Sequence, residues 1–328
     1  MGPSQADIWV GIALMCLILE ATRRAVGLPI VLVALAFLAY GMFGTYMPEF
    51  ISHRGYSVER LITYLVWSTE GVFGTPLAVS ATFVVIFIIF GAFMDRLGAG
   101  ALFIDLAVAL TGRIRGGPAL TSVLASGMMG SINGSSVSNV VTTGTFTIPL
   151  MKRFGYRPAF AGAVEATASM GGQIMPPVMG AVAFIMASFL GVPYAEVMIA
   201  AFLPALLFYI VLIFQVDNYA ARRGLKGLPE EEIPNLWETL KDGWPYLFSL
   251  AMLIYMLLFM RLESYAPYYA TLVLLFISLF KRNYRFNVTR AIALLSNLTT
   301  SVANLVAILA GIGLVVGGLS YTGVAGAF

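Results

Sequence analysis

The sequence has a single cysteine, a single histidine and few charged residues of either sign. With only one cysteine, Cys16, a disulfide framework or a zinc cluster of several cysteines is excluded. Charged residues make up 11% of the 328, whereas soluble domains carry about 25%. The formal net charge of +3 gives no reason to expect a nucleic-acid partner. These shortages exclude an ordinary soluble domain.

Hydrophobic residues, by contrast, make up 59% of the chain, and the mean hydropathy is +0.89. Glycine occurs 33 times, which suits membrane helices because small residues let their backbones approach closely. Residues Met1–Ala6 carry no basic group, so no cleavable signal peptide is expected. The composition predicts an all-α integral membrane protein in contact with the lipid bilayer.

The stretch Gly130–Gly144, GSINGSSVSNVVTTG, is polar and uncharged, and it lies between two apolar segments. An unpaired backbone amide in hydrocarbon costs several kcal/mol. Irregular backbone therefore survives at that depth only against protein or a water-filled cavity. We interpret this stretch as a candidate binding site around which the rest of the chain is organised.

Two apolar segments of half-bilayer length flank this stretch. Pro118–Met129 and Val140–Met151 each have 12 residues, or about 18 Å of helix, against a hydrocarbon core of about 30 Å. Their outer ends carry the basic residues Arg113, Arg115, Lys152, Arg153 and Arg157. Because Lys and Arg favour the cytoplasmic side, both ends are expected there. The pattern predicts a re-entrant hairpin at 118–151 with its tip near the membrane midplane.

A second interruption follows within residues 158–190. The segment GGQIMPP, Gly171–Pro177, places two glycines and two consecutive prolines between the apolar segments Pro158–Met170 and Val178–Leu190. Such a segment cannot sustain helical hydrogen bonding. We predict a discontinuous helix whose break faces the hairpin tip, an arrangement with which many secondary transporters build a midplane site.

Further apolar segments predict additional spans on both sides of these elements. After the broken helix come a return span at 197–216, a cytoplasmic amphipathic arm at Pro229–Asp242, spans at Trp244–Met260 and Tyr268–Phe280, the basic segment Lys281–Arg285, and a last span at Ala291–Leu319. Before the hairpin come Ile8–Leu19, Leu28–Phe43, an interfacial helix at Val58–Val72, Leu77–Met94 and Leu102–Leu110.

Counting crossings back from residue 112 puts Arg23 and Arg24 outside, against the charge rule. Either Val58–Val72 crosses the membrane after all, or a neighbouring subunit or a lipid headgroup holds the two arginines.

Within residues 113–204, the chain resembles the large membrane subunit of the tripartite ATP-independent periplasmic (TRAP) transporters. The resemblance is carried by GGP at Gly116–Pro118, by GSINGSSVSNVVTTGTFTIPLMKRFGYRP and by FAGAVEATASMGGQIMPPVMGAVAF. LEATRR at Leu19–Arg24, STEGVFGTPL at Ser68–Leu77 and EATASMGGQIMPP at Glu165–Pro177 are similar to the fused-permease branch that works with TAXI-type binding proteins.

The resemblance implies an ion-transporter-type, inverted-repeat elevator fold whose first repeat contains the re-entrant hairpin and the discontinuous helix. It divides the chain into 1–45, a remnant of small-subunit-like helices; 46–112, an interfacial helix and scaffold spans; 113–216, half of the transport domain; and 217–328, a cytoplasmic arm and scaffold helices that begin a second repeat. Since most of that second repeat is missing, we interpret the chain as a fragment that does not transport alone. The implied partners are a periplasmic TAXI-type substrate-binding protein and a small-subunit transmembrane domain, in a bacterial inner membrane.

The resemblance also implies secondary transport, usually coupled to Na+. Na+ needs several oxygen donors, which hydroxyls and unwound backbone carbonyls beside helix ends supply. Free N–H groups near Asn139–Val141 suit an organic carboxylate, and the lack of Asp and Glu at the tip argues against a divalent metal. The candidate ion- and substrate-binding residues are Ser135, Ser136, Ser138, Asn139, Thr142, Thr143, Gly171, Gly172 and Gln173. Each hydroxyl could instead only hold helices together, at about 0.6 kcal/mol.

Glu165 lies in an apolar segment about two turns before the break, where acidic residues indicate function by default. A protonatable carboxylate suits H+ coupling, so Glu165 is the candidate coupling residue. A structural role, through an ion pair or a hydrogen bond to another helix, stays open.

Other classes of function fit the sequence less well. A channel predicts a continuous polar stripe, whereas the sequence has localised breaks. An intramembrane enzyme needs an ionisable pair on the apolar spans, whereas His53 lies in a polar loop. No catalytic residue, resident metal or cofactor is therefore predicted, and Na+ or H+ enters as the coupling ion. The expected function is import of a small organic carboxylate, with a structural membrane subunit as the alternative.

Overall fold

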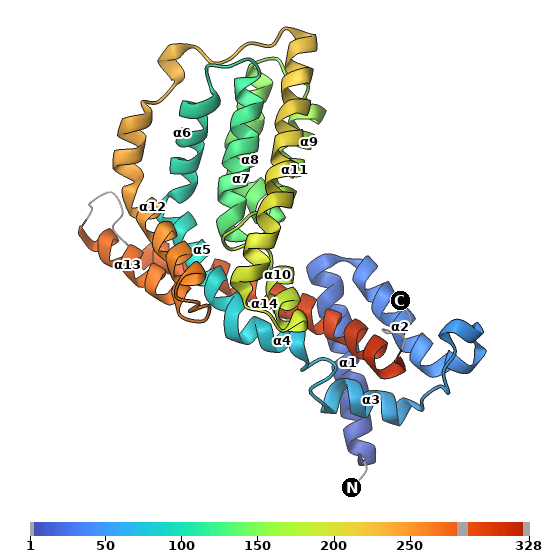
Figure 1. The fold of residues 1–328 in the computed structure, drawn as a ribbon. Helices are drawn as coiled ribbons and strands as arrows, with labels where there is room; N and C mark the ends of the chain where they lie inside the picture. The colour runs from blue at the N-terminus through green and yellow to red at the C-terminus, as the bar shows by residue number, and fades with distance from the viewer. Residues whose placement is uncertain (1–2, 281–287, 324–328) are drawn as a thin grey trace. The chain divides into compact units, whose positions relative to one another are not determined.

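The computed structural model describes residues 3–280 and 288–323 (Figure 1). In those ranges every regular element is a helix. Five helices are long and apolar enough to cross a bilayer: Gln5–Val26, Leu28–Tyr46, Thr75–Leu97, Tyr194–Arg223 and Ile292–Thr322. The chain forms two compact units, one of residues 1–85 and 299–328 and the other of residues 86–298. The predicted class, an all-α integral membrane protein, is confirmed.

The first unit contains α1 (Gln5–Val26), α2 (Leu28–Phe43), α3 (Val58–Trp67), α4 (Thr75–Val79), short 3-10 helices at Gly44–Tyr46 and Glu49–Ile51, and most of α14 (Val288–Thr322). α1 begins at a capping box, in which Ser4 Oγ accepts the N–H of Asp7 and the Asp7 carboxylate accepts the N–H of Ser4. Gly27, with φ of +93°, ends α1 and separates it from α2.

α3 is the helix that the sequence predicts at Val58–Val72, but it ends at Trp67. Its 10 residues span about 15 Å, which is too short for a hydrocarbon core of about 30 Å. Leu61, Ile62 and Leu65 are buried where α3 packs on α1 and α2. α3 is therefore too short to be the extra crossing that would reconcile Arg23 and Arg24 with the charge rule.

A π-helical turn at Ser80–Val84 joins α4 to α5. The second unit contains α5 (Val85–Leu97), α6 (Ala99–Thr111), α7 (Gly117–Asn133), α8 (Ser136–Arg153), α9 (Pro158–Gly171), α10 (Ala181–Leu190), α11 (Tyr194–Arg223), α12 (Leu236–Leu258) and α13 (Ala266–Phe280). α6, α7, α8, α9 and α11 run side by side (Figure 1). The GGP motif starts α7: Gly116 has φ of +75°, and a Cβ on Gly117 would lie 2.3 Å from the carbonyl oxygen of Gly112. Only glycine fits this turn.

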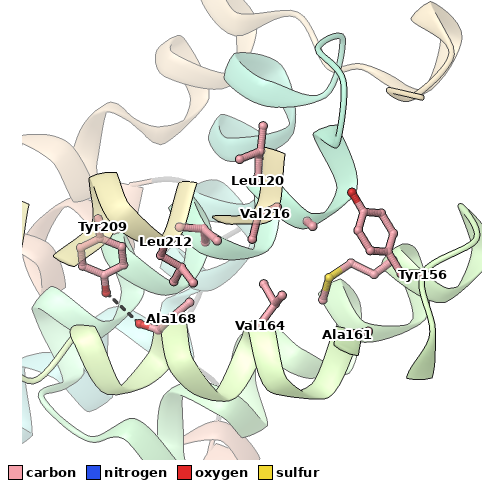
Figure 2. Close-up of a cluster of buried hydrophobic side chains, with 11 residues drawn as sticks. Leu120, Tyr156, Ala161, Val164, Ala168, Tyr209, Leu212 and Val216 are labelled. Carbon is pink, nitrogen blue, oxygen red and sulfur yellow. Dashed lines mark hydrogen bonds between the residues drawn. The ribbon is translucent and has the colours of Figure 1, made fainter. Parts of the chain in front are cut away.

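The apolar core of this unit lies between α7, α9 and α11 (Figure 2). Leu120, Val164, Leu212 and Val216 fill it, and Tyr209 Oη donates to the carbonyl of Ala168 at 2.8 Å. Burying a Val or Leu side chain contributes about 1.5–3 kcal/mol when it leaves water, but much less between helices that leave lipid. Close packing therefore matters more here than apolar character.

Several predicted boundaries are wrong. The hairpin arms are α7 and α8, with 17 and 18 residues rather than 12 each, because most of Gly130–Gly144 is helical and only Gly134 and Ser135 separate the arms. The predicted arm at Pro229–Asp242 is no separate helix, since Leu236 already starts α12. The basic segment Lys281–Arg285 lies outside the described residues.

The connection between α11 and α12 bonds to the basic ends of both hairpin arms. Leu228 N–H donates to the Gly112 carbonyl at 2.8 Å, just before α7. Arg113 pairs with Glu230 at 3.5 Å, and Arg153, the last residue of α8, pairs with Glu232. The basic ends of α7 and α8 therefore share one acidic partner segment.

Candidate functional site

The turn between α7 and α8 is short and specified by its own residues. Gly134 ends α7 in the left-handed conformation, with φ of +61°. Asn133 Oδ1 accepts the N–H of Ser135 at 3.1 Å, and Ser135 Oγ caps α8 by accepting the N–H of Ser138 at 3.4 Å. These side chains replace the missing helical hydrogen bonds of the turn.

The break between α9 and α10 covers residues 172–180, near the predicted Gly171–Pro177. Gly180 N–H donates to the carbonyl of Gln173 at 2.7 Å, which closes the break into a loop. Met179 has φ of +57°, an unfavourable value for a side chain other than glycine or asparagine. Strained backbone of this kind costs about 1–3 kcal/mol and gathers at functional sites.

The turn and the break are in direct contact. Val178 N–H donates to the Ser131 carbonyl at 3.0 Å, and Gln173 Nε2 donates to Ser136 Oγ at 2.9 Å. The backbones touch as well, because a Cβ on Gly130 would lie 2.5 Å from the Cα of Gly172. The structure therefore brings the two predicted interruptions together.

Asn139, in the first turns of α8, is fully buried and has one unpaired oxygen. Its Nδ2 donates to the Ser126 carbonyl at 2.7 Å and so joins α8 to α7. Its Oδ1 has no hydrogen-bond partner. A buried amide oxygen without a donor is costly, and it is a suitable ligand for a cation.

Glu165, in the middle of α9, is completely buried and surrounded by hydroxyl groups from three helices. From α7, Ser122 Oγ donates to Oε2 at 2.6 Å and Ser126 Oγ donates to Oε1 at 2.8 Å. From α8, Thr147 Oγ1 donates to Oε2 at 2.5 Å, and Thr143 Oγ1 donates to Oε1.

A fifth hydroxyl, Ser169 Oγ of α9, donates to Glu165 Oε1 at 3.2 Å. Two members of the cluster have a second acceptor: Thr143 Oγ1 lies 2.8 Å from the Asn139 carbonyl, and Thr147 Oγ1 lies 3.0 Å from the Thr143 carbonyl. Since a hydroxyl has one proton but also accepts, either threonine can turn its proton to the backbone and accept one from Glu165. The cluster therefore accommodates the carboxylate with or without a proton.

The predicted site residues fall into two groups. Ser135, Ser138 and Gln173 are exposed and Ser136 and Thr142 half-buried, whereas Asn139, Thr143, Gly171 and Gly172 are buried. Thr143 belongs to the Glu165 cluster, and Gly171 packs against Phe208 and Tyr209 of α11. The nine residues therefore do not form one continuous surface.

Sequence reasoning missed four partners of Glu165: Ser122, Ser126, Thr147 and Ser169. A signal was available, because Ser122 and Ser126, Thr143 and Thr147, and Glu165 and Ser169 are all spaced by four residues. That spacing puts both members on one helix face. Three such polar pairs in three apolar helices predict a shared buried contact.

Comparison with known proteins agrees with this architecture. A family model described as "Tripartite ATP-independent periplasmic transporter, DctM component" matches residues 13–328. The chain belongs to this family. By its description the family is a component of periplasmic transporters, and the relatives that carry a functional name are large permease proteins of such transporters.

Curated relatives match about half of the chain. This chain is 33% identical over 171 residues to the C4-dicarboxylate TRAP transporter large permease protein DctM of Pseudomonas aeruginosa, and the aligned region covers 52% of this chain and 39% of the relative. It is 28% identical over 168 residues to the ectoine/5-hydroxyectoine TRAP transporter large permease protein UehC of Ruegeria pomeroyi, with 51% and 39% covered. The uncharacterized protein YgiK of Salmonella typhimurium is 28% identical over 168 residues, with 51% and 38% covered. These matches span well under half the length of the relatives.

Proposed function

We propose that this chain is part of the membrane permease of an ion-coupled secondary transporter that imports a small organic carboxylate. The observation that carries the proposal is the contact between two interruptions, in which Gln173 and Val178 of the break bond to Ser136 and Ser131 of the hairpin. Unwound carbonyls and hydroxyls at such a contact are the donors that Na+ needs.

The substrate class follows from the N-terminus of α8 and from the names of the relatives. The N–H groups near Asn139–Val141 are not free as predicted, because α8 starts at Ser136 and the Asn139 N–H donates to the Ser135 carbonyl at 2.9 Å, so the orphan N–H groups of this helix precede Asn139. C4-dicarboxylates and ectoine share a carboxylate group, and relatives are named for each. A helix N-terminus attracts such an anion. We propose a TAXI-type periplasmic binding protein as the partner that delivers the substrate, a small-subunit transmembrane domain as the second partner, and residues 113–216 as half of a moving transport domain.

Asn139 is the residue that best fits Na+ at the hairpin. Its unpaired Oδ1 is buried beside the Gly130–Gly172 contact, where a Cβ on Gly130 would lie 2.9 Å from Asn139 Nδ2. The neighbouring Ser138 is exposed, so its hydroxyl lies on another face of α8 and is not a ligand of the same ion. Under this proposal the amide oxygen and carbonyls of the break bind the ion.

Glu165 supports H+ as the alternative coupling ion. Among the described residues no Lys, Arg or His forms an ion pair with it. Instead it has five hydroxyls, two of which can exchange donor and acceptor roles. Such a cluster suits a carboxylate that gains and loses a proton without moving its helices.

Uptake into proteoliposomes tests both versions. The full-length permease that contains this chain is reconstituted with its small membrane subunit and binding protein, and a Na+ gradient and a pH gradient are imposed separately. If Na+ binds at the hairpin, Asn139→Ala raises the Na+ concentration for half-maximal uptake about tenfold. Asn218→Ala is the matched control, because the exposed Asn218 donates only to its own helix.

If H+ is the coupling ion, Glu165→Gln abolishes uptake driven by the pH gradient, while Asp105→Asn, at an exposed carboxylate, does not. Unchanged Na+ activation in Asn139→Ala together with intact pH-driven uptake in Glu165→Gln contradicts both versions. Flux without the binding protein or any gradient contradicts the proposed function itself.

A further inference from the structure

Tyr194, the first residue of α11, has its hydroxyl in the break between α9 and α10. Its side chain is 1% exposed, and its ring stacks on Phe184 of α10 with centroids 4.1 Å apart and planes 2° apart. The hydroxyl donates to the carbonyl of Pro177 at 3.1 Å and to the carbonyl of Val178. The Tyr194 hydroxyl thus lies against two backbone carbonyl groups of the break.

Val178 is held from two sides. Tyr194 bonds to its carbonyl, and the Ser131 carbonyl of α7 accepts its N–H at 3.0 Å. A backbone group that leaves a helix needs another partner when it is buried. Tyr194 therefore supplies the donor that keeps Pro177 and Val178 in the unwound shape that contacts the hairpin.

The backbone of Tyr194 connects to a third segment. Its N–H donates at 2.5 Å to Oε1 of Glu263, which lies between α12 and α13. The first N–H groups of a helix have no intrahelical partner, and a carboxylate there suits the helix dipole. Burial raises the pKa of Glu263, while the N–H groups of Tyr194 and Ala195 lower it.

Glu263 lies at the end of the unit away from the basic ends of α7 and α8. Since α11 ends in Arg222 and Arg223, the charge rule that places those residues inside places Tyr194 and Glu263 outside. A continuous series of hydrogen bonds then runs from an outer connection through Tyr194 to the break and on to Ser131 of the hairpin.

We propose that Tyr194 is a positioning residue through which the outer connection at Glu263 sets the geometry of the break. The inference deepens the proposed function, because the break belongs to the proposed site. Anything that moves the α12–α13 connection then changes the break, and with it the affinity for the transported carboxylate.

Hydrogen exchange of the full-length permease tests this link without any need for transport. The reporters are the amides of Val178, which donates to the Ser131 carbonyl of the hairpin, and of Gly180, which donates to the Gln173 carbonyl inside the break. Tyr194→Phe and Glu263→Ala speed their exchange about fivefold to tenfold, as expected for a lost hydrogen bond. Glu263→Gln, which keeps an oxygen acceptor, restores most of the protection.

Tyr209→Phe is the matched control, because Tyr209 is a buried phenol on the same helix that donates to Ala168 of the intact α9. It leaves the two reporters unchanged, as does Glu196→Gln at an exposed carboxylate in the first turn of α11. If Tyr194→Phe leaves the exchange of Val178 and Gly180 as slow as Tyr209→Phe does, the link is overturned.

Uptake kinetics separate the link from the proposed function. Tyr194→Phe raises KM for the carboxylate about fivefold with a smaller change in maximal rate, whereas Tyr209→Phe changes neither. Faster exchange together with an altered KM supports the inference. Faster exchange in a permease that transports no carboxylate even as wild type supports the link and contradicts the proposed function.

Discussion

Two groups of helices in this chain are held together by different means. α1, α2, α3 and α14 pack through aliphatic side chains such as Ile18, Leu65 and Leu314. α7, α8 and α9 also have an apolar core, but in addition they meet around Glu165 and five hydroxyls. Both groups are expected in the same membrane, so lipid alone does not explain the difference.

Small residues carry the contacts of the first group. A Cβ on Gly311 of α14 would lie 2.6 Å from Thr22 Oγ1, and one on Gly317 would lie 2.7 Å from Leu65 Cδ2. The hydrogen bond from Thr22 Oγ1 to the Ala307 carbonyl joins α1 to α14. Helices of the first group thus associate by close approach, without a buried carboxylate at the contacts described. The comparison favours a functional role for the Glu165 cluster.

Replacing Glu165 by Ala is expected to have the largest effect. Ser122 and Ser169 lose their hydrogen-bond acceptor in a buried site, and a cavity forms beside Gly144. Unsatisfied buried groups cost about 1–3 kcal/mol each, so for these two hydroxyls the free energy of unfolding should fall by about 2–6 kcal/mol. Denaturant unfolding of the full-length permease in mixed micelles measures it.

Glu165→Gln, which keeps one oxygen acceptor, should lose clearly less stability than Glu165→Ala. If Glu165→Ala lowers the free energy of unfolding by less than about 1 kcal/mol, the cluster contributes no more than an ordinary polar contact between membrane helices. The contrast between the two groups of helices would then disappear.

Gly311→Ala should have an intermediate effect on the first group. The new Cβ would meet Thr22 at 2.6 Å and 2.8 Å, and overpacking of this kind costs about 1–3 kcal/mol. Gly162→Ala is the matched control on α9, since no atom lies within 4 Å of its added Cβ. It should be neutral or stabilise by up to about 1 kcal/mol, as alanine forms helices better than glycine. Equal effects at both glycines would contradict close packing between α1 and α14.

The sequence predicts where the backbone is interrupted better than it predicts how long the helices are. Glycine and proline act locally, so the break after Gly171 and the basic ends of the hairpin could be located from pattern alone. The polar residues at 136–139 are predicted as irregular but begin α8, because the partners that their side chains contact lie on other segments. Asn139 lies inside α8, where its Nδ2 donates to the Ser126 carbonyl of α7 while its Oδ1 stays unpaired.

The roles of Tyr194 and Glu263 were beyond sequence reasoning for the same reason. Tyr194 stands 16 positions from Val178 and 69 positions from Glu263. No helical spacing connects such positions, and only the folded unit shows that one residue bonds to both. The hydroxyl pairs around Glu165, in contrast, have a spacing of four residues that is visible in the sequence.

The smallest expected effect compares one substitution in both groups of helices. Thr22→Val removes a single bond to the Ala307 carbonyl and should cost about 0.6 kcal/mol, the average for such contacts in membranes. Thr147→Val has the same shape change but removes a donor to the buried carboxylate of Glu165. Hydrogen bonds to charged groups contribute about 1.5–3 kcal/mol, so Thr147→Val should cost at least twice as much in denaturant unfolding. If the two substitutions cost the same, Glu165 does not behave as a charged acceptor in the folded protein, which favours the protonated form of the cluster.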